Sequence, residues 1–185
     1  IASALRPSVL DTFGIIAAIE VEVKEFEQRT DIACFFNAHD EGAEVSPDIA
    51  ITLFRVMQEV LSNCMKHAQA SQIKVAIHNS RDAIILLVED NGRGFSDEDR
   101  RKSGSFGLRG IQERITHVSG EVLIQSTQGQ GTVIRIYMPH PLQKMDVPEW
   151  KVEQQQLLWP VSPAAPKARQ SETGAVERNG EHSID

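Results

Sequence analysis

The sequence predicts an α+β domain, a two-layer α/β sandwich in which a mixed sheet carries its helices on one face. Two observations lead to this class. Short runs of β-branched and apolar residues alternate with longer segments whose apolar residues recur every three or four positions. In chain order these segments give helix, strand, helix, a strand pair, a long loop, helix and a second strand pair. The 185 residues, 41% hydrophobic and 24% charged, suit one soluble domain with additional chain.

The first helix is expected at residues 8–26, directly after Pro7. Its apolar stripe consists of Val9, Leu10, Phe13, Ile16, Ile19, Val23 and Phe26. The stripe fits either a surface for a partner or the link to the domain's own core, and the sequence leaves both open. A strand at residues 32–36 and a polar loop at residues 37–45 follow.

The second helix begins with a strong local signal, Ser46-Pro47-Asp48. A capping hydroxyl, a proline at the first helical position and a carboxylate in the first turn each favour a helix N-terminus. The buried side of this helix is expected to contain Ile51, Phe54, Met57, Val60, Leu61 and Cys64.

A polar line runs along another side of the same helix. Glu59, Asn63 and His67 are four residues apart, which places a carboxylate, an amide and an imidazole above one another. Carboxylate and amide oxygens suit Mg²⁺. Taken alone, the pattern favours a plain polar helix face with a Glu–Asn hydrogen bond.

An apolar strand that ends in a carboxylate and two glycines is the central motif. A strand at residues 73–77 is expected to pair antiparallel with the strand at 83–88, which leads into Asp90, Gly92 and Gly94. Asn91-Gly92 also suits a type I′ hairpin turn. Residues 93–102 are charged and do not alternate, so a ligand-binding loop is the better interpretation. Glycines let a flat ring or a phosphate approach the backbone.

The last third of the expected domain holds a second glycine loop and a second strand pair. The loop at residues 103–110 leads into a helix marked by Ile111, Ile115 and Val118, and such a helix N-terminus is a ready anion site. Strands at 121–125 and 132–138 are joined by residues 129–131. From residue 141 on, proline, glutamine and polar residues predict a disordered tail.

Charge and cysteine usage exclude several classes. The net charge of −7 argues against a nucleic-acid surface. Cys34 and Cys64 lie far apart in apolar segments, which predicts buried thiols in a reducing compartment rather than a disulfide or a zinc site. No run approaches the length of a membrane span, and the given N-terminus has the pattern of neither a basic n-region nor a cleavage site. The chain lacks an initiator Met and is expected to be a piece of a longer protein, with an upstream membrane segment left open.

Four motifs follow one another along the chain: the polar line of the second helix, the strand that ends at Asp90, the glycine loop at residues 103–110 and the glycine turn at residues 129–131. In this order they resemble the ATP-binding domain of the superfamily that includes DNA gyrase B, Hsp90, MutL and sensor histidine kinases. Residues 58–70, 90–95, 106–114 and 129–132 are similar to the N, G1, G2 and G3 boxes of two-component kinases of the nitrate-sensor and DegS type. Leu5-Arg6-Pro7 and the residues after it resemble the end of that family's dimerisation helices. The expected division is 1–28 dimerisation helix end and linker, 29–140 histidine kinase-like ATPase domain, and 141–185 tail.

The resemblance implies specific roles. Asp90 would accept a hydrogen bond from the adenine amino group, Asn63 would hold Mg²⁺, and Glu59 would polarise a water or act as base. The residues that would contact the nucleotide are Asn63, Lys66, His67, Asp90, Gly92, Gly94, Gly107, Leu108, Gly110 and Thr132. Ser105 stands where the family often has glycine, with Gly104 displaced by one position.

The implied reaction is transfer of the ATP γ-phosphoryl group to a histidine and then to an aspartate of a response regulator. None of the six histidines precedes Leu5-Arg6-Pro7, so the acceptor is expected on a separate segment. A homodimer and a cytoplasmic domain are also implied, with inner-membrane anchoring of the full-length protein left open. The alternatives are an ATP-gated clamp of the same superfamily and a non-catalytic ATP-binding scaffold.

Overall fold

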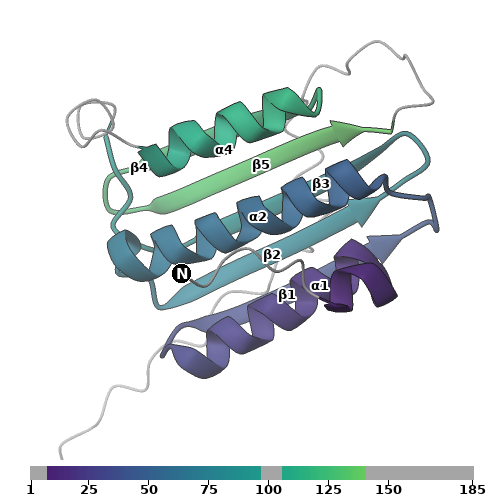
Figure 1. Ribbon diagram of the computed structural model, residues 1–185. Coiled ribbons are helices and arrows are strands. Elements are labelled where there is room, and N and C mark those ends of the chain that lie inside the picture. The colour runs from purple at the N-terminus through teal and green to yellow at the C-terminus, as the bar shows by residue number, and fades with distance from the viewer. Residues whose placement is uncertain (1–7, 97–105, 141–185) are drawn as a thin grey trace, which may run out of the picture.

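The computed structural model describes residues 8–96 and 106–140, which form one sheet with helices on one face (Figure 1). The expected tail and the positions of Gly104 and Ser105 lie outside the described residues. The elements are α1 (Ser8–Arg29), β1 (Ala33–Asp40), α2 (Pro47–Asn63), the π-helical turn η1 (Cys64–Ala68), β2 (Gln72–Asn79), β3 (Ala83–Asp90), α4 (Phe106–His117), β4 (Glu121–Thr127) and β5 (Gly131–Pro139). The predicted α+β class is confirmed.

Five strands make a mixed sheet in the order β1-β2-β3-β5-β4. β1 runs parallel to β2, and the other three pairings are antiparallel, so both predicted strand pairs are confirmed. In this register Asp90, at the end of β3, is opposite Ile73 of β2 and Thr132 of β5. The central motif therefore leaves the sheet between the starting ends of two neighbouring strands.

The core lies between the sheet and the helix layer, in which α2 lies between α1 and α4 (Figure 1). The predicted cap of α2 is present, because the Ser46 hydroxyl accepts a hydrogen bond from the Ile49 N–H at 3.4 Å. The fully buried large side chains are Ile19, Leu53, Met57, Leu61, Ile73, Ile77, Ile84, Leu86, Ile111, Ile115, Ile136 and Met138. No helix of the described ranges is long and apolar enough to cross a membrane.

The structure decides whether the apolar stripe of helix α1 is a partner surface or the link to the domain's own core. Ile19, Val23 and Phe26 are buried in the same core as α2, so the stripe joins α1 to the domain itself. The sequence pattern places Phe13 in this stripe too, but the residue is 72% exposed. Gly14 has φ 80° and ψ −179°, which interrupts the helical geometry. The 3.6-residue period therefore does not carry through to Phe13.

The first strand is longer than the sequence indicates. The predicted polar loop includes residues 37–40, yet β1 continues to Asp40 because it pairs with β2 residue by residue as far as Asn79. Backbone pairing at a sheet edge does not require apolar side chains. A strand predicted from its apolar residues alone therefore ends too early.

Candidate functional site

The loop after β3 is held to its neighbours on both sides. The Arg93 N–H donates to the Ala68 carbonyl of η1 at 2.7 Å, and the Gly129 N–H donates to the Arg93 carbonyl at 2.6 Å. The Phe95 N–H donates to the Ser126 hydroxyl of β4 at 2.9 Å. The next described element after Asn91-Gly92 is helix α4 and not a strand, so the type I′ hairpin is not formed. The motif is a fixed loop between the helix layer and the second hairpin.

Asn91 fixes the start of this loop, a role that sequence reasoning missed. Its Oδ1 accepts hydrogen bonds from the N–H groups of Ser71 and Gln72 at 3.0 and 2.9 Å, and its Nδ2 donates to the Ser71 hydroxyl at 2.9 Å. The local pattern identifies this asparagine only as half of a turn pair, and its partners lie about twenty residues upstream, where no local pattern points. Ser126 was missed for the same reason.

We expect Asn91→Ala to lower the free energy of unfolding by about 1–2 kcal/mol, because two backbone donors and one hydroxyl lose their partner. Urea denaturation of the variant and the parent measures this difference. Gln128→Ala, which truncates another exposed amide in the turn after β4, is the matched control and should change stability by under about 0.5 kcal/mol. Equal effects of the two substitutions would contradict the assigned role of Asn91.

Asp90 is the last residue of β3, and its side chain is half-buried. Its Oδ1 accepts the Gly92 N–H at 2.8 Å, and Thr132 donates to the carboxylate as well. Burial raises the pKa of Asp90 above its ordinary value, with a smaller contribution in the same direction from Glu89, while the bonds from Gly92 and Thr132 act in the opposite direction. A shielded carboxylate with an ordered set of donors is a strong acceptor for a further ligand donor.

The glycines permit close approach of backbone to backbone. A Cβ on Gly92 would overlap the Ala68 carbonyl oxygen and lie 2.8 Å from Asp90 Oδ1. Gly94 has φ 58°, and a Cβ there would overlap the Thr127 carbonyl. A Cβ on Gly131 would overlap the Asp90 carbonyl. The protein's own packing thus requires these glycines, whatever further role Gly92 and Gly94 have toward a ligand.

The polar line of α2 meets the start of α4. A Cβ on Gly107 would lie 2.6 Å from Glu59 Oε1 and 3.1 and 3.2 Å from the amide atoms of Asn63. The Asn63 Nδ2 atom is buried and has no hydrogen-bond partner within the described ranges. The expected alternative, a Glu–Asn hydrogen bond on a solvated face, is therefore wrong. Packing of α4 over α2 leaves a carboxylate and an unpartnered amide together under a helix N-terminus.

The end of α2 changes from α-helix to the π-helical turn η1, which sequence reasoning did not anticipate. Its wider i→i+5 turn ends the four-residue spacing after Asn63, so the exposed His67 does not continue the Glu59–Asn63 line. Lys66 is exposed on the same turn. The turn closes at Gln69, which has φ 53° and ψ 35°. Through it the Ala68 carbonyl reaches the loop after β3.

Cys64, the first residue of η1, carries a buried thiol. Burial raises the pKa of Cys64 to about 12, with further contributions from the negative charge of Asp90 and from Cys34. The pKa of the half-buried Cys34 is raised to about 11, by burial and by Glu27. Both cysteines are free thiols, as predicted, but only Cys64 is buried as expected. With these pKa values both thiols stay protonated at neutral pH.

Helix α4 begins earlier than the predicted glycine loop allows. Because it starts at Phe106, Gly107 and Leu108 lie in its first turn, where backbone N–H groups have no partner in the helix. Gly110 lies four residues after Phe106, so its N–H has a carbonyl acceptor within the helix. The side chain of Leu108 packs against the core. The N–H groups without an acceptor inside the helix therefore belong to Gly107 and Leu108 rather than to Gly110.

A separate cavity of about 260 Å³ lies between the start of α1 and the segment after β1. Phe13, Gly14, Asp40 and Asn79 are among the residues that line it, and it contains none of the predicted nucleotide-binding residues. The candidate site is thus defined by the polar and glycine contacts described above, at the opposite end of β2 and β3.

Comparisons with known proteins agree with this architecture. Residues 48–142 match the family described as histidine kinase-, DNA gyrase B- and HSP90-like ATPase. The chain is 38% identical over 135 residues to the signal transduction histidine-protein kinase/phosphatase DegS of Brevibacillus brevis, covering 73% of this chain and 35% of that protein. It is 34% identical over 139 residues to the Bacillus subtilis (strain 168) protein of the same name, covering 72% and 36%. The chain spans about a third of the length of these relatives.

Two solved structures share the fold at 22% sequence identity. The histidine kinase domain of the Erythrobacter litoralis EL346 blue-light activated histidine kinase superposes with a TM-score of 0.54, covering 68% of this chain and 60% of that chain. The blue-light activated histidine kinase itself superposes with a TM-score of 0.52, covering 68% and 41%.

Proposed function

Because this chain belongs to the histidine kinase-, DNA gyrase B- and HSP90-like ATPase family, we propose that it is the ATP-binding catalytic domain of a two-component sensor histidine kinase. The γ-phosphoryl group of ATP goes to a histidine on a separate segment and from there to an aspartate of a response regulator. The observation that carries this proposal is the placement of Glu59 and Asn63 directly under the N-terminus of α4. A carboxylate, an amide and free helix N–H groups then face one region.

The base of the nucleotide is assigned to Asp90. Its half-buried carboxylate accepts a hydrogen bond from the exocyclic amino group of adenine. The low polarity of the surroundings strengthens that hydrogen bond. Guanine carries a carbonyl oxygen at the corresponding position, which would face the carboxylate with like polarity. Gly92 and Thr132, which donate to Asp90, hold the acceptor in place, and Gly94 keeps the loop open beside the ring.

The phosphates are assigned to the region between α2 and α4. The Gly107 and Leu108 N–H groups bind phosphate oxygens at the positive end of the helix, with Gly110 in the following turn. Lys66 and His67, exposed on η1, add phosphate contacts.

The amide oxygen of Asn63 and the nearby Glu59 carboxylate are hard oxygen ligands that fit a magnesium ion bound together with the phosphates. The buried Asn63 Nδ2, which has no partner within the described ranges, is a donor that suits a phosphate oxygen. In this proposal Asn63 holds Mg²⁺ through Oδ1, and the bound ion neutralises phosphate charge. Glu59 orients a water molecule or takes up the proton at the acceptor.

The remaining parts of the chain have proposed roles in the longer protein. Residues 29–140 form the nucleotide-binding unit, with α1 packed onto its core, and residues 1–28 continue into the dimerisation helices of a homodimer. The response regulator is the macromolecular partner, and nucleic acid is not. The domain lies in the cytoplasm.

Replacing Asn63→Ala should weaken Mg²⁺-ATP binding by about tenfold, because a buried polar partner is worth about 1–2 kcal/mol. Calorimetric titration with ATP, in Mg²⁺ and in EDTA, measures this loss. The expected signature is that the parent gains affinity from Mg²⁺ and that the variant gains less. Ser62→Ala, one residue earlier on the same helix, is the control. Identical ATP affinity of the parent with and without EDTA would contradict the metal role of Asn63.

A further inference from the structure

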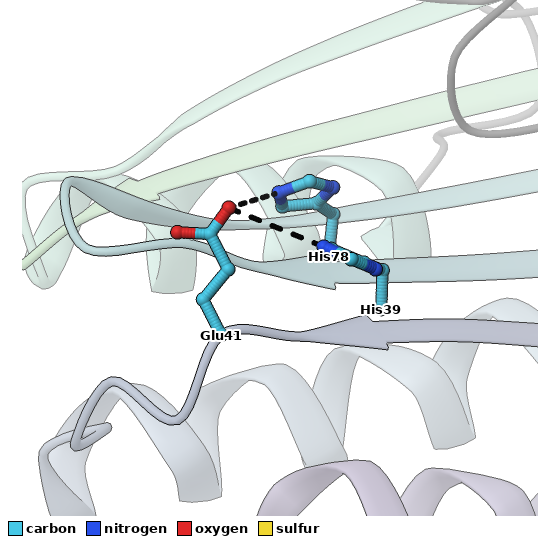
Figure 2. A group of neighbouring side chains, drawn as sticks. All are labelled: His39, Glu41 and His78. Atoms are coloured by element: carbon cyan, nitrogen blue, oxygen red, sulfur yellow. Dashed lines mark ion pairs between the residues drawn. The ribbon is translucent and has the colours of Figure 1, made fainter.

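Three side chains of metal-binding types meet at the far end of the sheet. His39 lies on β1, His78 lies on β2, and the parallel register makes them direct neighbours. Glu41 follows two residues after His39 and therefore lies on the same side of the strand. Figure 2 shows the Glu41 carboxylate turned toward both imidazole rings. None of these residues has a part in the nucleotide site.

The group lies on the face of the sheet that the helices do not cover. Cys34 and Phe36 of β1 pack against the helix-covered core, and His39 lies on the opposite side by strand alternation. The register also separates it from Asp90, because Asp90 pairs with Ile73 whereas His78 pairs with Ile85. Five residues along a strand correspond to roughly 17 Å. The two sites thus differ in both face and end of the sheet.

The distances suit a shared ion. Glu41 Oε1 lies 3.8 Å from His78 Nε2 and 4.0 Å from His39 Nε2, and the potential ligand atoms all lie within 4.8 Å of one another. Zinc bonds to such atoms are about 2.0–2.1 Å long, so ligand atoms in a tetrahedral site are about 3.4 Å apart. A movement of roughly 1 Å, within the reach of side-chain rotation, brings the three atoms to these positions.

The backbone around Glu41 is already fixed. Its N–H donates to the Asn79 carbonyl at 2.8 Å, next to His78. The buried Asn79 side chain donates to Asp40 Oδ1 at 2.8 Å and to the Ala43 carbonyl at 2.7 Å. These bonds hold the segment that carries Glu41 against the strand that carries His78. Binding an ion therefore requires ordering of side chains only, which favours affinity.

We propose that His39, Glu41 and His78 form a surface site for a divalent transition-metal ion of the zinc class. Two imidazole nitrogens and one carboxylate oxygen suit Zn²⁺, Cu²⁺ or Ni²⁺, whereas Mg²⁺ and Ca²⁺ prefer oxygen ligands throughout. Three protein ligands leave one position for water or for a group from another molecule. Because β1 is the edge strand, the bound ion would also link β1 to β2.

The competing explanation is an ion-pair cluster with no affinity for metal. The side chain of His39 is 64% exposed, that of Glu41 is 42% exposed, and that of His78 is 29% exposed. Exposed ion pairs of this kind contribute little to the stability of a protein. The two explanations differ in what zinc does to the folded protein, since an ion that binds only the native state raises its stability.

Calorimetric titration of the metal-free chain with ZnCl₂ tests the proposal. We expect one saturable Zn²⁺ per chain, a higher melting temperature in zinc, and visible absorption bands when Co²⁺ replaces Zn²⁺. The double variant His39→Gln/His78→Gln should bind Zn²⁺ at least about tenfold more weakly, because even the loss of an outer-shell partner costs about 10–100-fold in metal affinity. It should also lose the zinc-dependent rise in melting temperature.

His117→Ala, which removes another exposed histidine at the end of α4, is the matched control and should bind Zn²⁺ as the parent does. Thermal unfolding without metal shows whether the variants are folded. The Zn²⁺ affinity of Glu41→Gln, which leaves both imidazole rings in place, is a second measurement of the site. The proposal is overturned if the parent shows no saturable binding. It is equally overturned if the double variant keeps the parent affinity, or if His117→Ala loses as much as the double variant.

Discussion

Asp90→Asn is expected to weaken ATP binding by about 10- to 100-fold, because a hydrogen bond to a charged group contributes about 1.5–3 kcal/mol. The substitution keeps the size of the side chain, and the amide oxygen can still accept the Gly92 N–H. What changes is the negative charge offered to the adenine amino group. Titration with ATP and with GTP in the presence of Mg²⁺ measures both affinities, and only the affinity for ATP should decrease.

The same substitution should make the stability of the domain depend less on pH. Burial raises the pKa of Asp90 above its value in the unfolded chain, so the folded state binds more protons between those two values. Stability from this group is therefore present below the unfolded pKa and is lost as pH rises through the folded one. An asparagine side chain does not titrate, and thermal unfolding of the variant should show less decline over that window.

Glu89→Gln is the matched control for Asp90→Asn. Glu89 is the preceding residue, its Oε1 lies 3.6 Å from Lys74 Nζ, and its side chain is nearly half exposed. Its substitution removes one negative charge at almost the same place in the sequence, yet it should leave ATP affinity unchanged. If Asp90→Asn binds ATP as the parent does, or if Glu89→Gln weakens binding equally, the assignment of adenine to Asp90 is wrong.

Gly107→Ala is expected to lower the affinity for Mg²⁺-ATP by about tenfold or more. In the longer protein it should lower the rate of phosphotransfer by about 100-fold, because a displacement of about 1 Å at a reacting centre can reduce a rate by that much. The added methyl group would lie 2.6 Å from Glu59 Oε1 and 3.1 Å from Asn63 Nδ2. Relief of this contact displaces the Glu59 carboxylate, the Asn63 amide or the start of α4. Each displacement disturbs the proposed phosphate and magnesium site.

A second alanine substitution on α4 separates helix stability from site geometry. A Cβ on Gly110 would meet no atom within 4 Å, and Gly110→Ala should stabilise the protein by about 0.5–1 kcal/mol through helix propensity. Gly107→Ala carries the same propensity gain, so a loss of nucleotide binding there is steric in origin. Calorimetric titration and thermal unfolding of both variants give the comparison. Parent-like Mg²⁺-ATP affinity in Gly107→Ala would contradict the proposed site.

Local chemistry explains most of what could be predicted. Ser46 and Pro47 determine a helix start without help from distant residues, and period-2 and period-3.6 patterns identify the other elements. Asp90 is recognisable because it ends an apolar strand and is followed by glycines. The prediction that the four motifs form one ATPase-type site comes from their order along the chain and its resemblance to a known family, not from any one motif.

The features that were missed depend on contacts between distant segments. The π-helical turn at residues 64–68 has no sequence signature, and its Ala68 carbonyl is used by a loop twenty-five residues later. Asn91 and Ser126 act through partners on other elements. The cluster of His39, Glu41 and His78 exists only because β1 and β2 pair in one register.

The sequence by itself therefore determined the fold class and the order of the helices and strands, because those follow from patterns within about ten residues. Only the tertiary structure decided that Gly107 lies against Glu59 and Asn63, and that Asp90 is shielded while receiving donors from Gly92 and Thr132. The reason is physical. Burial, close backbone approach and strand register are properties of segments packed together, and no single segment carries them.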